Sequence, residues 1–181
     1  GKRVERGHLH PLSIAVQDIV SIFSSLGFEI AEGPEIETEW YNFDALNIPA
    51  GHPARDLMDT FWLLRSQKSQ ISNLKSQRLL LRTHTSPVQI RYMQNHQPPL
   101  RIIAHGKIFR YEATDASHDF EFHQLEGLMV DKDISIANFK AIIETFFQKF
   151  FKADIRIRLC PSFYPFVEPG FDVFITCTQC R

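Results

Sequence analysis

The sequence predicts an α+β fold in which an antiparallel β-sheet is flanked by helices. Amphipathic helical patterns over residues 11–26 and 133–150 predict the helices. Two apolar segments, 101–112 and 122–130, are joined by a polar loop and predict paired strands. A chain of 181 residues can form one domain with a substantial core, or part of a larger domain.

The charge balance excludes some classes of function. The chain has 20 Lys and Arg against 21 Asp and Glu, and Lys2, Arg3 and Arg6 are its densest basic cluster. Such a composition lacks the basic stripe that follows a DNA backbone. No apolar run approaches the roughly 20 residues that cross a bilayer, and the first residues lack the pattern of a signal peptide. We therefore expect a soluble, cytoplasmic protein without a membrane or DNA partner.

The first half of the chain gives one clear helix and several weaker patterns. Apolar residues recur at helical spacing from Pro11 to Leu26, and Gly27 follows as a stop signal. Residues 28–30 predict a short strand that ends before Gly33-Pro34, where a missing donor suits an edge or an interface. Residues 40–55 show no period and predict an ordered loop. Residues 61–64 predict a strand, and the polar segment 66–77 receives no function.

A helix start follows the apolar residues 79–82. Ser86 is the expected N-cap, Pro87 occupies the first helical position and Gln89 completes a capping box. The predicted helix runs to about Asn95, before the prolines at 98 and 99.

The predicted hairpin has a chemically mixed face. Because side chains alternate along a strand, Gln124 and Glu126 share a face with Phe122, Leu128 and Val130, which suggests a pocket wall. Arg110 lies between two aromatic residues on the preceding strand and could bind an anion over the same sheet. The alternative is an exposed cross-strand ion pair of Arg110 with Glu126 or Glu112.

The last third predicts a helix, a strand and a second pocket wall. Asp133 or Ser135 can cap a helix whose apolar stripe extends to Phe150 and predicts core packing. Residues 155–159 alternate as a half-buried strand, and the aromatic and proline-rich segment 163–170 suits a pocket wall.

Three cysteines argue against a disulfide framework. Cys177 and Cys180 form a C-x-x-C pair, and Cys160 would have to supply a third ligand to a zinc ion that needs four. Zinc at Cys177 and Cys180 is therefore possible in principle, but unpaired thiols are the expected state.

Seven short sequence segments occur in this chain in the same order as in one enzyme family. They are residues 27–29, 33–37, 42–49, 52–56, 59–62, 81–86 and the hairpin 106–130. In this combination the chain resembles the catalytic module of the alpha subunits of bacterial phenylalanyl-tRNA synthetases, which are class II aminoacyl-tRNA synthetases. The likeness covers nearly the whole chain.

The resemblance implies two of the three class II motifs. The helix from Pro11 and the strand before Pro34 match the first motif, which lies at a dimer interface. Arg110 and Glu112 through Glu126 match the second motif. The glycine-rich third motif is absent, so the resemblance implies that residues 1–181 are a single partial catalytic domain. Such a piece lacks part of the ATP site, the rest of its sheet at the C-terminus and the N-terminal tRNA-binding arm.

The implied reaction is the activation of phenylalanine with ATP and transfer of the product to tRNA(Phe). A carboxylate is already ionised at neutral pH, so this step needs alignment and charge compensation, not a general base. The resemblance assigns Arg110 as the catalytic residue and as an ATP ligand. It places Glu112 beside the nucleotide and Glu168 at a magnesium position.

The resemblance also assigns the residues that bind the amino acid. His84, Ser86, Gln124 and Glu126 would hold its ammonium group, and Tyr164 and Phe166 would hold its ring. From the residues alone, Ser86 could serve only as a helix cap and His84 only within a loop. Relatives have the order Tyr-Phe where this chain has Phe163-Tyr164.

The resemblance further implies a beta subunit that edits errors and completes an (αβ)2 heterotetramer. Two other functions stay open at this stage. One is a class II-like paralogue that binds an amino acid or regulates a partner without aminoacylation. The other is a ligase that forms an adenylate of another acid without tRNA.

Overall fold

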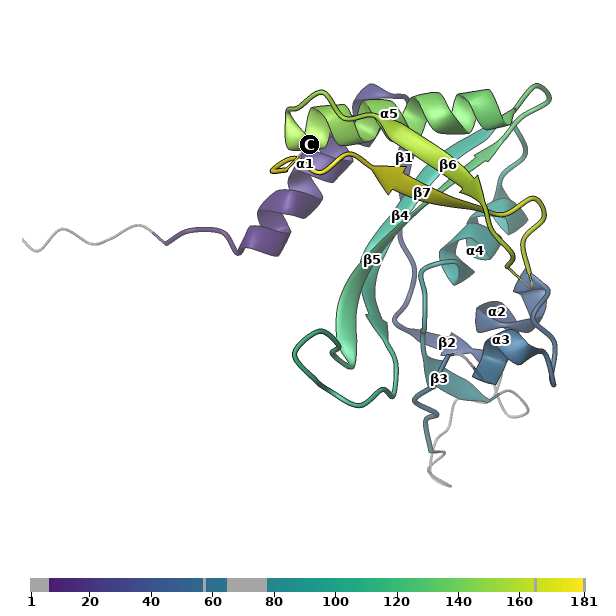
Figure 1. Ribbon diagram of the computed structural model, residues 1–181. Coiled ribbons are helices and arrows are strands. Elements are labelled where there is room, and N and C mark those ends of the chain that lie inside the picture. The colour runs from purple at the N-terminus through teal and green to yellow at the C-terminus, as the bar shows by residue number, and fades with distance from the viewer. Residues whose placement is uncertain (1–6, 57, 65–77, 165, 181) are drawn as a thin grey trace, which may run out of the picture.

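A long β-hairpin forms the centre of the fold (Figure 1). The computed structural model describes residues 7–56, 58–64, 78–164 and 166–180. The basic residues Lys2, Arg3 and Arg6 and the segment 66–77 lie outside the described residues. Strand β4 (Leu100–Phe109) pairs in antiparallel register with β5 (Glu121–Val130), so that Gly106 stands opposite Gln124 and Ala104 opposite Glu126. The predicted hairpin is thus confirmed, although its first strand ends one residue before Arg110.

The third strand of the central sheet runs parallel to its neighbour. Strand β1 (Glu29–Ala31) pairs with β4 and forms the edge of the order β1-β4-β5. The predicted antiparallel sheet therefore contains one parallel pair, and β1 lies at an edge, which is one of the two positions expected before Pro34. A parallel pairing requires a long crossover, and β4 lies about 70 residues after β1 in the chain.

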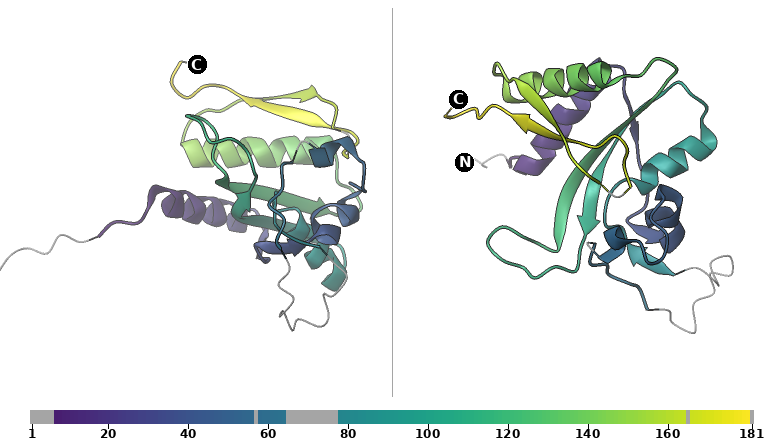
Figure 2. Two further views of the ribbon diagram at one scale, coloured as in Figure 1. Left: turned by 90° about the horizontal axis from the view of Figure 1, so that it is seen from below. Right: turned by 45° about the vertical axis from the view of Figure 1, so that its right-hand side comes forward.

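Helices cover both faces of the hairpin (Figure 2). Helix α1 (Pro11–Ser25) and helix α5 (Ile136–Phe151) pack on one face, where Phe23, Phe28, Ile103 and Phe146 form a core cluster. Helix α4 (Pro87–Asn95) packs on the other face through Val88, against Ile102 and Ala104. Since Ile102 and Ile103 are neighbours, their opposite contacts follow from the alternation of side chains along β4.

Helix boundaries agree with the sequence patterns, but one predicted cap is absent. Helix α1 ends before Gly27, whose φ of +80° is the left-handed conformation that glycine adopts easily. Ser135 and Asn138 form a reciprocal capping box at the start of α5. Ser86 precedes α4 in helical geometry and makes no side-chain cap bond, so the predicted capping box of Ser86 and Gln89 is wrong.

A second small core lies beside the hairpin. Short helices α2 (Glu39–Asn42), η1 (Asp44–Leu46) and α3 (Pro53–Asp56) replace the loop predicted over residues 40–55. They pack beside the pair of β2 (Ile36–Thr38) and β3 (Leu79–Leu81). The strand predicted over 61–64 is wrong, because only Trp62 forms a bridge, with Leu80. The shared core contains Phe43, Ile48, Ala54 and Leu80.

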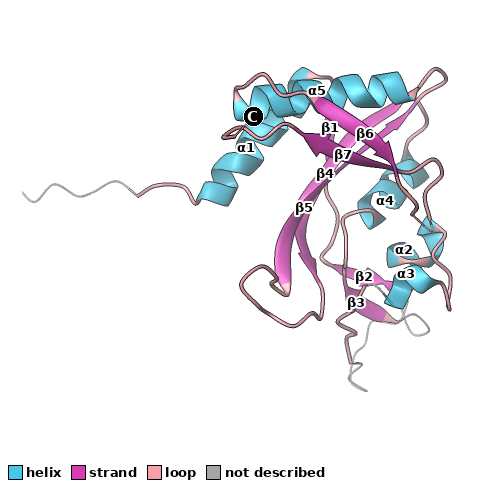
Figure 3. Ribbon diagram, in the orientation of Figure 1, coloured by secondary structure: helices cyan, strands magenta, loops and turns pink. Residues whose placement is uncertain are grey.

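The last two strands form a separate hairpin. Strand β6 (Ile157–Pro161) pairs with β7 (Phe171–Ile175), and together they cross near α5 (Figure 3). The loop between β6 and β7 brings Phe166 to the second core. None of the helices in the described ranges combines the length and the apolar composition of a membrane span.

Candidate functional site

Charged and polar residues from three chain segments converge on one pocket. The pocket has a volume of about 370 Å³, which is within the range for sites that bind small molecules. Its polar lining comes from residues 84–89 at the start of α4, from Arg110 after β4 and from the α4 face of β5, and its apolar lining comes mainly from the second core. The lining residues are Leu46, Ile48, Met58, His84, Ser86, Gln89, Arg110, Gln124, Glu126, Phe166 and Val167.

One end of the pocket is acidic. The Ser86 hydroxyl lies 2.8 and 2.7 Å from the two carboxylate oxygens of Glu126, and the Gln89 amide donates to Oε2 at 2.6 Å. These bonds explain why Ser86 and Gln89 do not cap α4. They fix the carboxylate of Glu126 and leave its negative charge without a basic partner at salt-bridge distance in the described ranges. This end can bind an ammonium group.

Gln124 is held in one orientation by the backbone. The Thr85 N–H donates to its Oε1 at 2.9 Å. Because that bond assigns the oxygen, the side-chain NH2 group keeps its donors for a ligand. Gln124 can therefore bind an anionic group of the ligand beside the acidic end.

The opposite side of the pocket is cationic. The Nε of Arg110 donates to the Thr83 carbonyl at 3.2 Å, and its guanidinium lies 5.3 Å from the Phe122 ring centroid. No carboxylate in the described ranges lies within salt-bridge distance of Arg110, so the alternative ion pair with Glu126 or Glu112 does not form. The terminal nitrogens of Arg110 can therefore bind a phosphate or a carboxylate.

His84 is buried in the pocket wall without hydrogen bonds. Its exposure is 5%, and neither ring nitrogen has a partner among the described residues. Burial lowers the pKa of His84 to about 4, the Asn42 backbone carbonyl opposes this, and the charge of Arg110 lowers it further. At neutral pH the ring is uncharged and offers one donor and one acceptor to a ligand. A buried polar group without partners is uncommon, and the Thr85 hydroxyl beside His84 is unpaired in the same way.

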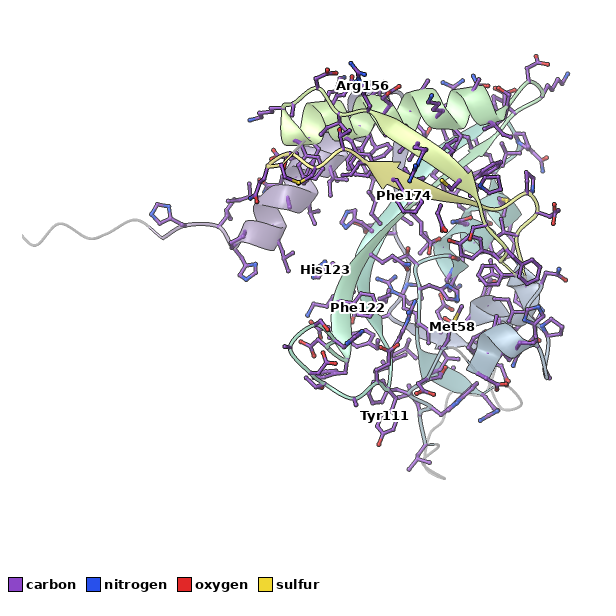
Figure 4. All side chains as sticks on the ribbon, in the orientation of Figure 1. Met58, Tyr111, Phe122, His123, Arg156 and Phe174 are labelled. Atoms are coloured by element: carbon purple, nitrogen blue, oxygen red, sulfur yellow. The ribbon has the colours of Figure 1, made fainter. Side chains whose placement is uncertain are left out.

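The second core supplies an apolar wall. Met58 and Phe166 line the pocket and also pack against the buried side chains of that core. Figure 4 labels Met58, which follows α3, and Phe122, which lies on β5. A pocket with one apolar wall and polar groups opposite suits an amphipathic small molecule.

Three of the predicted site residues lie outside this lining. Tyr164 is partly exposed, and its hydroxyl donates to Asp172. Glu112 follows the end of β4, and Glu168 is exposed in the loop between β6 and β7. The structure therefore brings together His84, Ser86, Arg110, Gln124, Glu126 and Phe166, but not these three.

Neither predicted metal position has a complete set of ligands among the described residues. In the described part of the chain no group of three or more His, Cys, Asp or Glu could hold a metal ion. The single carboxylate of Glu168 does not complete a magnesium site by itself, but Mg²⁺ that is bound to substrate phosphates needs only one or two protein carboxylates. Cys160, Cys177 and Cys180 are free thiols. The backbone N–H groups of Cys180 and Gln179 lower the pKa of Cys177, but two thiols do not complete a zinc site.

Sequence reasoning missed Gln89 and Met58 as pocket residues. Gln89 matched a capping pattern, and that pattern does not predict the hydrogen bond that its side chain donates to Glu126. The relevant signal was its position in the first turn of the helix that begins at Pro87, three residues after Ser86 and on the same side. Met58 reaches the pocket only through the packing of the second core, which no local pattern predicts.

Comparison with known proteins agrees with this geometry. The family described as "tRNA synthetases class II core domain (F)" matches residues 1–181. The chain belongs to the class II tRNA synthetase core-domain family. The predicted α+β class II fold is thereby confirmed, and the polar pocket of this core domain lies on its central hairpin.

Several relatives of the core domain share about half of its residues. A phenylalanine–tRNA ligase alpha subunit of Desulfotalea psychrophila is 48% identical over 180 residues, which cover 99% of this chain and 49% of the relative. The alpha subunit of Citrifermentans bemidjiense is 50% identical over 181 residues, which cover 100% of this chain and 50% of the relative. The chain thus spans about half the length of these curated relatives.

Solved structures support the fold alone. A pyrrolysyl-tRNA synthetase of Desulfitobacterium hafniense has a TM-score of 0.66 and covers 93% of this core domain and 56% of that chain. A second structure from the same organism, a PylSc chain, has a TM-score of 0.64 and covers 92% and 54%. The identity is 16% in both cases, so the likeness concerns the fold and not the substrate.

Proposed function

We propose that this chain is the catalytic core of a phenylalanine–tRNA ligase alpha subunit. It activates phenylalanine with ATP and transfers the product to tRNA(Phe) as part of a longer protein. The observation that carries this proposal is the pocket with Glu126 at one end, Arg110 at the other and an apolar wall beside them. The names of the relatives with about 50% identity support the same substrate.

The charges of the pocket suit amino-acid activation. The carboxylate of Glu126 receives the substrate ammonium group, and Ser86 and Gln89 hold it in place. The resemblance assigns Gln124 and His84 to the ammonium group, but the Gln124 oxygen already accepts from Thr85, so we assign its NH2 group and the neutral His84 to the substrate carboxylate. The ionised carboxylate attacks the α-phosphorus, a bond forms between its oxygen and phosphorus, and pyrophosphate leaves.

Arg110 supplies the charge compensation in this step. Its guanidinium is always charged, and its Nε is fixed to the Thr83 carbonyl, so its terminal donors are preorganised for the phosphate. No residue must remove a proton, because the nucleophile is an ionised carboxylate. Glu112 contacts the nucleotide and Tyr164 contacts the ring in this proposal, both from outside the pocket lining.

The remaining parts of the proposal follow from the alpha-subunit assignment. ATP is a substrate, and magnesium bound to its phosphates neutralises part of their charge, with Glu168 as the proposed protein ligand. The partner is a beta subunit in an (αβ)2 heterotetramer, and the reaction occurs in the cytoplasm. Residues 1–181 are one partial catalytic domain in this proposal.

A substrate panel tests the proposal. The full-length alpha subunit, assembled with its beta partner, is assayed for ATP–pyrophosphate exchange with each of the twenty amino acids. Phenylalanine should give the highest kcat/KM. Tyrosine should be activated about 100-fold less efficiently, because an apolar pocket discriminates weakly against an added hydroxyl. Exchange that depends on another amino acid, or no exchange, would overturn the proposal.

A further inference from the structure

Arg82 is a buried arginine that binds backbone and not a carboxylate. Its exposure is 3%, and its guanidinium donates to the carbonyls of Lys107 at 2.7 Å and Gly33 at 3.1 Å. No carboxylate in the described ranges lies within salt-bridge distance. Burial lowers the pKa of Arg82, and the charges of Glu35, Glu37 and Glu126 oppose this effect. Arg82 therefore fastens β4 to the link between β1 and β2.

Gly106 makes the space that the guanidinium occupies. A Cβ at this position would lie 2.3 Å from Nη2 and 3.5 Å from Cζ of Arg82. The end of a long side chain can often move aside, but here hydrogen bonds to two segments hold it. Gly106 also has a φ of +153° and stands opposite Gln124 in the strand pair. Gly106 thus lies directly against the guanidinium of Arg82 and is also the strand partner of the pocket residue Gln124.

The residues after Arg82 orient both sides of the pocket. The Arg82 carbonyl accepts from the Phe109 N–H at 2.9 Å, one residue before Arg110. The Thr83 carbonyl then accepts from Arg110, and the Thr85 N–H donates to Gln124. Arg82 itself does not line the pocket. Its effect on the pocket must therefore pass through segment 83–86.

We propose that Arg82, seated on Gly106, is a positioning residue for amino-acid activation. It fixes segment 83–86 against the hairpin. In this position the Thr83 carbonyl accepts from Arg110, and the Thr85 N–H donates to Gln124. This inference rests on the proposed function, because its readout is the activation reaction.

The first test is Gly106→Ala in the full-length alpha subunit assembled with its beta partner. The added methyl group displaces the guanidinium, and a shift of about 1 Å in a catalytic group can cost about 100-fold in rate. We expect kcat/KM for phenylalanine-dependent exchange to fall about 100-fold at a temperature where circular dichroism shows a folded protein. KM for phenylalanine should rise through Gln124, and kcat should fall through Arg110.

Gly127→Ala is the matched control in the same hairpin. The nearest atom to a Cβ at Gly127 would be the Ile102 carbonyl oxygen at 3.9 Å, so kcat/KM should stay within twofold of wild type. A purely structural role would lower the folded fraction and leave KM of the folded enzyme unchanged. Gly106→Ala activity within twofold of Gly127→Ala would overturn the inference.

Arg82→Lys and the double variant provide a second test that does not need Gly106→Ala to fold. Lysine keeps the charge with fewer donors, and we expect about a tenfold loss of kcat/KM. Because lysine has no Nη2, the alanine methyl group meets no guanidinium in the double variant, and only the backbone cost of alanine at a φ of +153° should add to the loss of Arg82→Lys. A double variant whose loss of kcat/KM equals the product of the two single losses would overturn the inference. A folded Arg82→Lys variant with wild-type kcat and KM would also overturn it. A silent wild-type enzyme would instead overturn the proposed function.

Discussion

His84 is the pocket residue whose charge state depends most directly on its burial. Its pKa of about 4 lies below the ordinary value of 6.5, so the folded protein keeps the ring neutral where the unfolded chain would protonate it. The neutral ring contributes its full share of stability above pH 6.5. That share decreases as the pH falls toward 4, because the unfolded state takes up a proton that the folded state does not.

The pH dependence of unfolding measures this effect. The difference between the two pKa values corresponds to about 3 kcal/mol. Between pH 7 and pH 4, the unfolding free energy of wild type should decrease by about this amount more than that of His84→Gln. Urea unfolding across this range checks the prediction, and His8→Gln controls for the loss of an exposed histidine. Parallel pH profiles for wild type and His84→Gln would show that the ring is not buried.

At the scale of the elements, two serines with the same expected capping role have different functions. Ser135 caps α5 through its reciprocal bonds with Asn138. Ser86 stands at the start of α4 but donates to Glu126. The sequence pattern predicts both helix starts correctly, because it depends on local backbone preferences. It cannot predict which serine binds a residue 40 positions away.

Alanine substitutions separate the two roles. Ser135→Ala should lower the unfolding free energy by about 1 kcal/mol and leave exchange activity unchanged, since only a cap is lost. Ser86→Ala has no cap bond to lose, and it should lower kcat/KM for phenylalanine 10- to 100-fold because Glu126 loses a charge-assisted hydrogen bond. Denaturant unfolding and exchange kinetics on both variants check this. Equal effects of the two substitutions on activity would contradict the assignment.

At the scale of the whole molecule, long-range packing determines the features that local sequence patterns do not predict. The alternation in residues 122–130 correctly predicts a mixed strand face, and the helical stripes correctly predict α1 and α5. The parallel pairing of β1 with β4 and the short helices over 39–56 are not predicted, because they depend on contacts between distant segments. For the same reason, Phe166 reaches the pocket wall while its near neighbour Tyr164 bonds to Asp172.

The core between α1, β4 and α5 should dominate stability. Phe146 is 8% exposed and stacks on Phe23, with ring centroids 4.9 Å apart. Phe146→Ala should lower the unfolding free energy by at least about 3 kcal/mol because it leaves a cavity. Phe163, which is 84% exposed, is the control, and its replacement by alanine should change stability by less than about 0.5 kcal/mol. Similar decreases in the unfolding free energy of both variants would show that Phe146 is not part of the dominant core.

The central claim is that Arg110 and Glu126 divide one reaction between charge compensation and substrate binding. The most direct test is steady-state phenylalanine-dependent ATP–pyrophosphate exchange by the full-length assembly carrying Arg110→Ala or Glu126→Gln. Arg110→Ala should lower kcat at least 100-fold with a smaller change in KM for phenylalanine, whereas Glu126→Gln should raise that KM 10- to 100-fold. Normal exchange by Arg110→Ala would contradict the account.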